Sequence, residues 1–210
     1  MLLVKICGIT RLDDAEAAVA AGARALGFVF WPDSPRFVDP HRARLIVCAL
    51  PPFVTTVGVF VNQPIDYVNG VASLVRLSAM QLHGDETVDY ASALARPVIK
   101  AMAVDEATTA NAADGWPARV TALLDVHDPQ RRGGTGRTVD WTIAAAIAAR
   151  RRAILAGGLR ADNVADAVAR VRPFGIDVSS GVERSPGVKD HGRLRALFEV
   201  VHDIDHAARS

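Results

Sequence analysis

Residues 2–30, LLVKICGITRLDDAEAAVAAGARALGFVF, contain the repeating unit that decides the fold. Two apolar runs, LLVKIC and ALGFVF, have the length and the β-branched or aromatic content of buried strands. Between them, DDAEAAVAA has helical spacing. We expect Thr10 to cap this helix, with Asp13 three residues later, and Gly22 to end it. The stretch therefore predicts a strand, a helix and a second strand that lies parallel to the first.

The same pattern recurs along the chain. Counting from the strand that ends at Cys7, the intervals between successive predicted strand ends are 20 to 32 residues, and a helical pattern follows each strand. Eight βα units whose strands are apolar on both faces predict an α/β fold, the (βα)8 TIM barrel, with eight parallel strands and outer helices. A doubly wound open sheet is the alternative. Since no linker or low-complexity segment interrupts the pattern, we expect residues 1–210 to form a single catalytic domain. The other predicted strand ends are Phe30, Val61, His83, Ala103, Asp125, Gly157 and Ser179.

Composition and charge limit the possible partners. The chain has 210 residues, 50% of them hydrophobic, and 24 basic against 23 acidic residues. A formal charge of +1 creates no broad field for nucleic acid or an anionic membrane, so we expect a small-molecule substrate, no nucleic acid and no membrane partner. The oligomeric state does not follow from the sequence.

The N-terminus and the cysteines indicate a cellular compartment. The first residues lack the layout of a signal peptide, and no apolar run approaches the roughly 20 residues that span a bilayer. Cys7 and Cys48 are too few for a disulfide scaffold, and neither has a histidine at metal-ligand spacing. We therefore expect a cytoplasmic protein without a bound metal. Cys48, on an amphipathic helix, is expected to lie in the core.

Glycine and serine clusters follow the last two predicted strands. Gly157 and Gly158 come after the seventh strand, and Ser179, Ser180 and Gly181 come after the eighth. In (βα)8 barrels the loops after these two strands commonly build a phosphate site from backbone N–H groups. The clusters predict a phosphorylated ligand, although ordinary turn chemistry would also explain them.

The sequence GGTG at 133–136 has a different meaning. It lacks the spacing of a Walker motif and of a dinucleotide-binding fingerprint. It favours a loop that passes close to the ligand, and a long solvent loop is the alternative.

Cys7 ends the first strand. A buried thiol is often inert core packing. At the mouth of a barrel, however, the thiol would be partly exposed, and Lys5 on the same side of the strand would favour the thiolate. A thiolate could act as a general base or as a nucleophile. A nucleophile usually has an activating histidine, and no sequence pattern ties His83 or His127 to Cys7.

Three other residues complete the list of candidates. Asp125 ends an apolar strand, where it is either a hydrogen-bond partner or a general acid whose pKa burial raises. Strands one and six are not neighbours, so Asp125 and Cys7 would face a substrate from opposite sides. Arg36, which follows the two prolines of FWPDSPRFV, is either a surface residue or a bidentate clamp for a substrate carboxylate. His83 in MQLHG is expected to line the pocket.

Taken together, these motifs resemble the phosphoribosylanthranilate isomerase family of tryptophan biosynthesis. The resemblance covers nearly the whole chain and rests on KICG, FxxxSPR, GVFVN, MQLHG, LLD followed by GGTG and DW, LAGGL, and DVSSGVE in this order. It implies a (βα)8 barrel that catalyses an Amadori rearrangement. The reaction converts N-(5'-phosphoribosyl)anthranilate to 1-(2-carboxyphenylamino)-1-deoxyribulose 5-phosphate by general acid/base catalysis. The family is an aldose–ketose type of intramolecular oxidoreductase and uses no metal or organic cofactor.

The resemblance also implies roles for individual residues. Cys7 would be the base that removes the proton from ribose C2', and Asp125 would be the acid that protonates the ring oxygen. Arg36 would hold the anthranilate carboxylate, and Asp177 would orient the ligand. The residues implied around the phosphate are Gly134, Gly158, Ser180 and Gly181.

Two alternative functions were considered. Another sugar-phosphate isomerase or epimerase could use the same barrel, although a metal-dependent epimerase would need more His and Asp ligands than the chain offers. A non-catalytic sugar-phosphate binder or a thiol redox protein would belong to a different class. The presence of both Cys7 and Asp125 opposes the binder, and the absence of CxxC opposes the redox protein.

Overall fold

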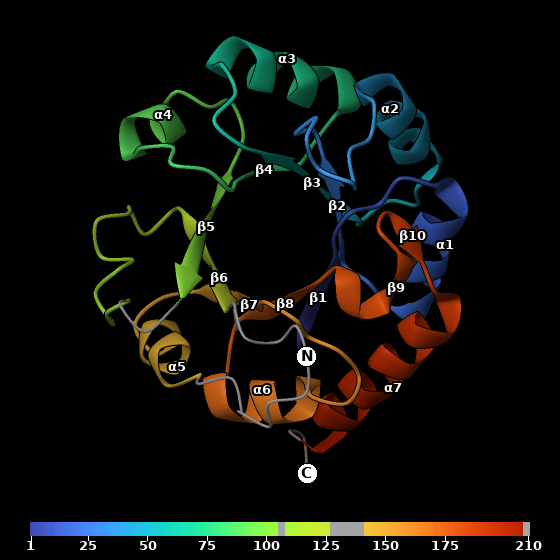
Figure 1. Ribbon diagram of the computed structural model, residues 1–210, viewed down its shortest axis with the longest axis vertical. Helices are drawn as coiled ribbons and strands as arrows, with labels where there is room; N and C mark the ends of the chain where they lie inside the picture. The colour runs from blue at the N-terminus through green and yellow to red at the C-terminus, as the bar shows by residue number, and fades with distance from the viewer. Residues whose placement is uncertain (105–107, 127–140, 208–210) are drawn as a thin grey trace.

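Eight parallel strands close into a barrel in the computed structural model, which describes residues 1–104, 108–126 and 141–207 (Figure 1). The strands follow one another in chain order around the ring, and β1 pairs with both β2 and β8. The closed ring confirms the predicted barrel and excludes the open sheet. The strands are β1 (Leu3–Ile6), β2 (Ala25–Val29), β3 (Thr55–Phe60), β4 (Ala79–Leu82), β5 (Val98–Val104), β6 (Thr121–Val126), β7 (Ala153–Ala156) and β8 (Gly175–Val178).

Helices surround the barrel on its outside (Figure 1). Two shorter elements, the 3-10 helix η1 and the hairpin of β9 and β10, lie between β8 and the last helix. The helices are α1 (Leu12–Ala21), α2 (Pro40–Ala49), α3 (Ile65–Val75), α4 (Val88–Ser92), α5 (Thr142–Ala148), α6 (Val164–Val171) and α7 (His191–Ala207), with η1 at Ser180–Val182, β9 at Glu183–Ser185 and β10 at Val188–Lys189.

The expectation of a helix after every strand is wrong for β5. Residues 108–120 form turns and contain no helix. The segment is rich in turn-forming residues such as Asn, Asp, Gly and Pro, which favour local turns over a continuous helix. Arg151, after α5, satisfies part of its backbone: the guanidinium donates hydrogen bonds to the carbonyl groups of Ala113, Trp116, Pro117 and Val120.

The first helix differs from the prediction at its start and agrees at its end. Arg11 occupies the N-cap position, and its side chain makes no capping hydrogen bond. Thr10 is not the cap, because its hydroxyl instead donates to the carbonyl of Gly187 at 2.5 Å. Gly22 ends the helix with a φ of 119°, a left-handed conformation that glycine adopts at low cost.

The principal core lies between the strands and the helices. Phe28, Phe30 and Phe60 are fully buried there, and the rings of Phe30 and Phe60 stack at 5.4 Å between centroids. Burial of each such ring stabilises the folded state by about 1.5–3 kcal/mol relative to an exposed ring. Cys48 is exposed on α2 and does not belong to this core, contrary to expectation, because the buried face of that helix is formed by Ala43 and Ile46.

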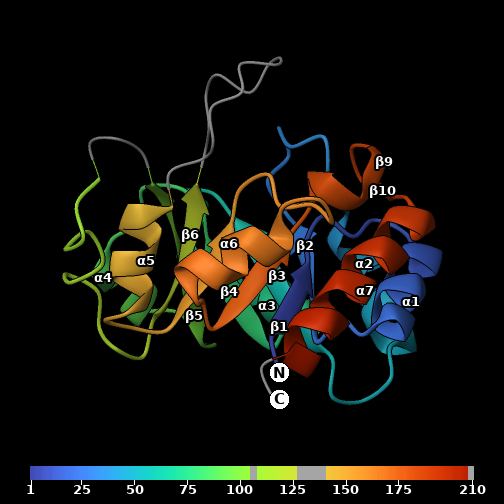
Figure 2. The ribbon, with the colours of Figure 1, turned by 90° about the horizontal axis from the view of Figure 1, so that it is seen from below.

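The hairpin of β9 and β10 was not expected from the sequence. Its strands pair antiparallel, and β10 has only two residues, too few to give a periodic pattern. Figure 2 shows the hairpin beside the carboxyl ends of the strands, at the end of the barrel away from both chain termini. It therefore stands at the rim where (βα)8 barrels carry their sites.

Candidate active site

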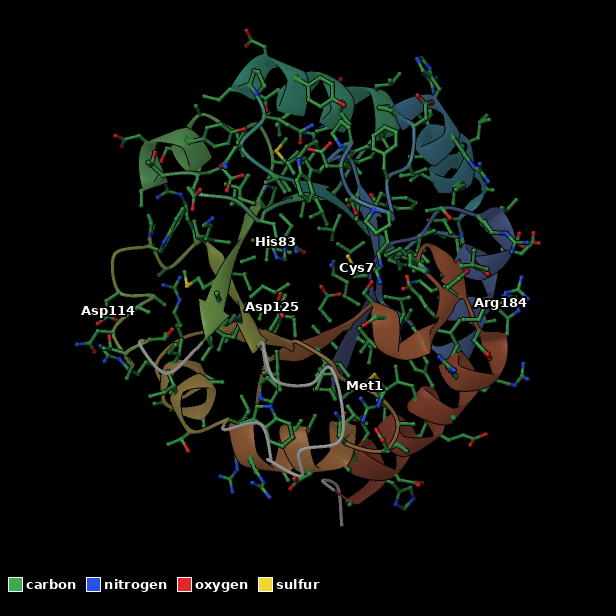
Figure 3. All side chains as sticks on the ribbon, viewed as in Figure 1. Met1, Cys7, His83, Asp114, Asp125 and Arg184 are labelled. Atoms are coloured by element: carbon green, nitrogen blue, oxygen red, sulfur yellow. The ribbon has the colours of Figure 1, made fainter. Side chains whose placement is uncertain are left out.

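A pocket of about 600 Å³ opens at the carboxyl ends of the strands. Figure 3 shows Cys7, His83 and Asp125 around the central opening of the ring, each from a different strand or strand end. Gly134 and the rest of GGTG lie outside the described residues. The predicted residues that line the pocket are Cys7, Arg36, His83, Asp125, Gly157, Gly158, Asp177, Ser179, Ser180 and Gly181.

Cys7 is more buried than expected. It lines the pocket but is only 8% exposed, and its backbone amide donates to the carbonyl of Val178 at 2.9 Å. Burial raises the pKa of the thiol. Lys5 acts to lower that pKa and Asp177 to raise it. The expectation of a lowered pKa is wrong for the unliganded protein, because burial outweighs the nearby cations.

A buried ion pair lies next to the thiol. Lys5 Nζ donates to Asp177 Oδ2 at 2.8 Å, across neighbouring positions of β1 and β8. Burial acts to lower the pKa of Lys5, but the charges of Asp177 and Cys7 and their hydrogen bonds together outweigh burial, so the pKa is raised and the ammonium stays charged. The other carboxylate oxygen of Asp177 is buried without a hydrogen-bond partner among the described residues. Asp177 also lines the pocket.

Gly27 on β2 makes room for this arrangement. A Cβ atom at Gly27 would lie 2.7 Å from Cys7 Sγ and 3.0 Å from Lys5 Nζ. Both side chains thus occupy the space that a larger residue would fill.

Arg36 reaches the pocket from a tight turn after β2. Its amide donates to Ser34 Oγ at 3.1 Å, and Phe37 N donates to the carbonyl of Ser34 at 3.0 Å. The side chain crosses above Gly8, where a Cβ would come within 2.7 Å of Arg36 Cδ. Arg36 also lines the pocket, and its guanidinium contacts Glu183.

His83 and Asp125 form the opposite side of the pocket. His83 Nε2 lies 3.6 Å from Asp125 Oδ2, and Gln81 Nε2 lies 3.1 Å from His83 Nδ1. The Asp125 side chain is 31% exposed and that of His83 is 40% exposed. Asp125 is therefore less enclosed than its position on an apolar strand suggested.

The loops after β7 and β8 meet at the rim. Gly157 and Gly158 have φ values of 98° and 59°, so a side chain there would strain the backbone. A Cβ at Gly181 would lie 1.9 Å from the carbonyl oxygen of Leu159, which brings the two loops into close approach. The backbone of both loops is thus brought close to one part of the pocket.

Sequence reasoning missed two buried residues beside the pocket. Glu183 on β9 accepts hydrogen bonds from Arg36, and Lys189 on β10 donates to Glu183 Oε1 at 2.8 Å. Glu183 is the last residue of DVSSGVE, but that motif carried no sign of its contact with Arg36. Lys189 had no motif at all.

Neither a metal-ligand cluster nor a membrane-spanning helix is found in the described residues. Among residues 1–104, 108–126 and 141–207, no group of three or more His, Cys, Asp or Glu side chains is placed to hold a metal ion. In the same part of the chain, no helix combines the length and the apolarity that crossing a membrane requires.

The fold and the site define a (βα)8-barrel enzyme with a thiol, a carboxyl group and an arginine at one pocket. The sequence profile of the family described as "N-(5'phosphoribosyl)anthranilate (PRA) isomerase" matches residues 4–200. The chain is 52% identical over 199 residues to the N-(5'-phosphoribosyl)anthranilate isomerase of Geobacter metallireducens, covering 94% of this chain and 98% of that protein.

Solved structures agree with this match. The crystal structure of phosphoribosyl anthranilate isomerase from Thermus thermophilus superposes with a TM-score of 0.86 at 43% identity, over 97% of this chain and all of that one. A complex of the isomerase with reduced 1-(o-carboxyphenylamino)-1-deoxyribulose 5-phosphate gives a TM-score of 0.83 at 40% identity, with the same coverage. The chain belongs to the phosphoribosylanthranilate isomerase family, as the sequence motifs predicted.

Proposed function

We propose that this isomerase converts N-(5'-phosphoribosyl)anthranilate to 1-(2-carboxyphenylamino)-1-deoxyribulose 5-phosphate with Cys7 as the general base and Asp125 as the general acid. One observation carries the assignment of roles. Cys7 directly follows β1 and Asp125 is on β6, so the thiol and the carboxyl group lie on different sides of one pocket that Arg36 and the two glycine-rich loops also line. A substrate in this pocket would meet an acid, a base and two anion-binding regions at once.

The chemistry needs two proton transfers. Asp125 gives a proton to the furanose ring oxygen, the C1'–oxygen bond breaks, and the ring opens to a protonated Schiff base. The Cys7 thiolate then takes the proton from C2', and the electron pair forms the C1'–C2' double bond of an enolamine. Tautomerisation moves a proton from the C2' hydroxyl to C1' and gives the ketone.

The remaining residues hold the substrate. Arg36 binds the anthranilate carboxylate through charge-assisted hydrogen bonds. The loops at Gly157–Gly158 and Ser179–Gly181 bind the phosphate, together with Gly134, and Asp177 accepts a hydrogen bond from a sugar hydroxyl. His83, beside Asp125, lines the pocket. The proposal uses no metal or cofactor.

We also propose a single catalytic domain over residues 1–210 and a cytoplasmic location. One closed barrel uses strands from Leu3 to Val178, which supports the single domain. Both cysteines are free, as is common in a reducing compartment. The family matches do not favour another sugar-phosphate isomerase, an epimerase or a non-catalytic binder.

The test follows the fluorescence of phosphoribosylanthranilate, generated in place by a separate transferase. We expect an enzyme-dependent loss of fluorescence and chemical identification of the ketose product. A Cys7→Ser variant with an unchanged circular dichroism spectrum is the control. If folded wild-type protein leaves the fluorescence unchanged, the activity and both catalytic roles are wrong.

A further inference from the structure

Arg36, Glu183 and Lys189 form a chain of three charges beside the pocket. Arg36 Nε lies 3.0 and 3.1 Å from the two carboxylate oxygens of Glu183, and Arg36 Nη2 donates to Glu183 Oε2 at 2.6 Å. Lys189 Nζ donates to Glu183 Oε1 at 2.8 Å. Glu183 therefore fixes the guanidinium in a bidentate geometry that a flexible arginine would not keep alone.

The Glu183 carboxylate, which positions Arg36, would also repel the substrate carboxylate that Arg36 is proposed to bind. A substrate carboxylate bound to Arg36 would lie near the Glu183 charge, and the Arg36–Glu183 pair by itself has no net charge. Lys189 changes this balance, because the three groups together carry one positive charge. An added positive charge behind Glu183 therefore strengthens the attraction of the Arg36 site for an anion.

We propose that Lys189 is a positioning residue that keeps the Arg36 site positively charged, so that the site selects ligands with a carboxylate on the aromatic ring. The inference rests on the proposed role of Arg36 as the carboxylate clamp. Lys189 does so without touching the substrate, since its side chain is fully buried and does not line the pocket.

The surroundings of Lys189 support a fixed cation. Its ammonium group also donates to the carbonyl of Cys7 at 2.5 Å and lies 3.5 Å from that of Ser179, and its amide donates to Asp14 Oδ2 at 3.0 Å. Burial raises the pKa of Glu183, but hydrogen bonds from Arg36 and Lys189 outweigh it and the pKa is lowered, so Glu183 is an anion at neutral pH. The pKa of Lys189 is lowered, because burial outweighs the hydrogen bond to Glu183 and its charge. The hydrogen bonds to Glu183 and to the carbonyl of Cys7 are the contacts that hold the ammonium form in place.

The test compares two ligands. One is reduced 1-(o-carboxyphenylamino)-1-deoxyribulose 5-phosphate, and the other is the same compound without the ring carboxylate. The measured quantity is the ratio of their Kd values. We expect Lys189→Met to lower the preference for the carboxylate roughly tenfold. The double variant Lys189→Met/Glu183→Gln, which removes one charge of each sign, should recover the preference to within about threefold of wild type.

Control variants separate this inference from its basis. Lys100→Met removes another buried lysine, which pairs with Glu86 at 3.0 Å away from Arg36, and should leave the ratio unchanged. Arg36→Met should abolish the preference, and if it does not, the clamp itself is wrong and the inference falls with it. If Arg36→Met abolishes the preference but Lys189→Met does not lower it, only the inference is overturned.

A purely structural role for Lys189 predicts a different pattern. The double variant would then bind the carboxylate ligand as poorly as Lys189→Met, which would also overturn the inference. Thermal melts check folding, and if Lys189→Met does not fold, Lys189→Gln, which loses the charge but keeps a donor, replaces it in both variants.

Discussion

The two sides of the pocket treat their titratable groups in different ways. On the β1 side, Cys7 is almost fully buried, and Lys5, Asp177 and Lys189 all influence its pKa. On the β6 side, the Asp125 carboxyl is 31% exposed and lies 3.6 Å from His83. The proposed base is thus surrounded by enclosed charges, whereas the proposed acid is partly open to solvent.

Replacement of the base tests the buried side most strongly. Cys7→Ser exchanges a thiol for a hydroxyl of similar shape that is a far poorer base at neutral pH. We expect kcat to fall about a thousandfold while KM changes little, because general base catalysis contributes 10²–10⁴-fold. Steady-state fluorescence kinetics measure both constants. An unchanged kcat would remove Cys7 from the mechanism.

Replacement of the acid tests the exposed side. Asp125→Asn keeps the shape and removes the transferable proton. We expect a fall in kcat of about a hundredfold, less than for Cys7→Ser, because water can reach this side and supply protons slowly. The same assay is used, with His83→Gln as a neighbouring control that should lose less activity. If Asp125→Asn keeps wild-type kcat, the acid is another group.

The dependence of kcat/KM on pH tests the β1 side of the pocket. The thiolate is the active form of the proposed base. Because the pKa of Cys7 is raised, kcat/KM should keep increasing with pH beyond the ordinary pKa of a thiol. Lys5→Met removes a cation that lowers this pKa and leaves Asp177 uncompensated. It should move the rise to higher pH by about one unit, and lower kcat/KM at pH 8 roughly tenfold.

The profile is measured at constant ionic strength, with Lys100→Met as the buried-lysine control. A wild-type profile that is flat from pH 7 to 9, or one that Lys5→Met leaves in place, contradicts the assignment.

The smallest expected effect concerns the second cysteine. Cys48 is exposed on α2, far from the described contacts of the pocket, so Cys48→Ser should change the free energy of unfolding by no more than about 0.5 kcal/mol. Alkylation followed by mass spectrometry should modify Cys48 well before the buried Cys7. Rapid modification of Cys7 in the unliganded protein would contradict the closed environment described for it.

The sequence predicted the strands well because each is a short apolar run between turn residues, and that pattern is local. It predicted which residues reach the rim for the same reason, since strand ends of a closed barrel all meet there. It failed where contacts are distant in the chain. The absence of a helix at residues 108–120 accompanies contacts with Arg151, and Thr10 is not a cap because it bonds to Gly187 instead.

The failure to predict Glu183 and Lys189 as site residues has the same explanation. Glu183 and Lys189 act through Arg36 on another loop, 147 residues from Glu183, and a two-residue strand has no period to detect. The expected downward shift of the Cys7 pKa is wrong mainly because burial raises that pKa, and the sequence did not show how deeply the thiol is enclosed. It also did not show that Asp177, which raises the same pKa, pairs with Lys5.

The segment at 108–120 forms turns on the outside of the barrel, where most other strands are followed by a helix. One guanidinium, that of Arg151, bonds to four of its carbonyl groups where other units have a packed helix. A segment without a helix, whose carbonyl groups depend on one side chain for their hydrogen bonds, is expected to open in local fluctuations. Local unfolding of the native state should therefore begin at this segment, and its amides should exchange with deuterium before those of β1 and β8.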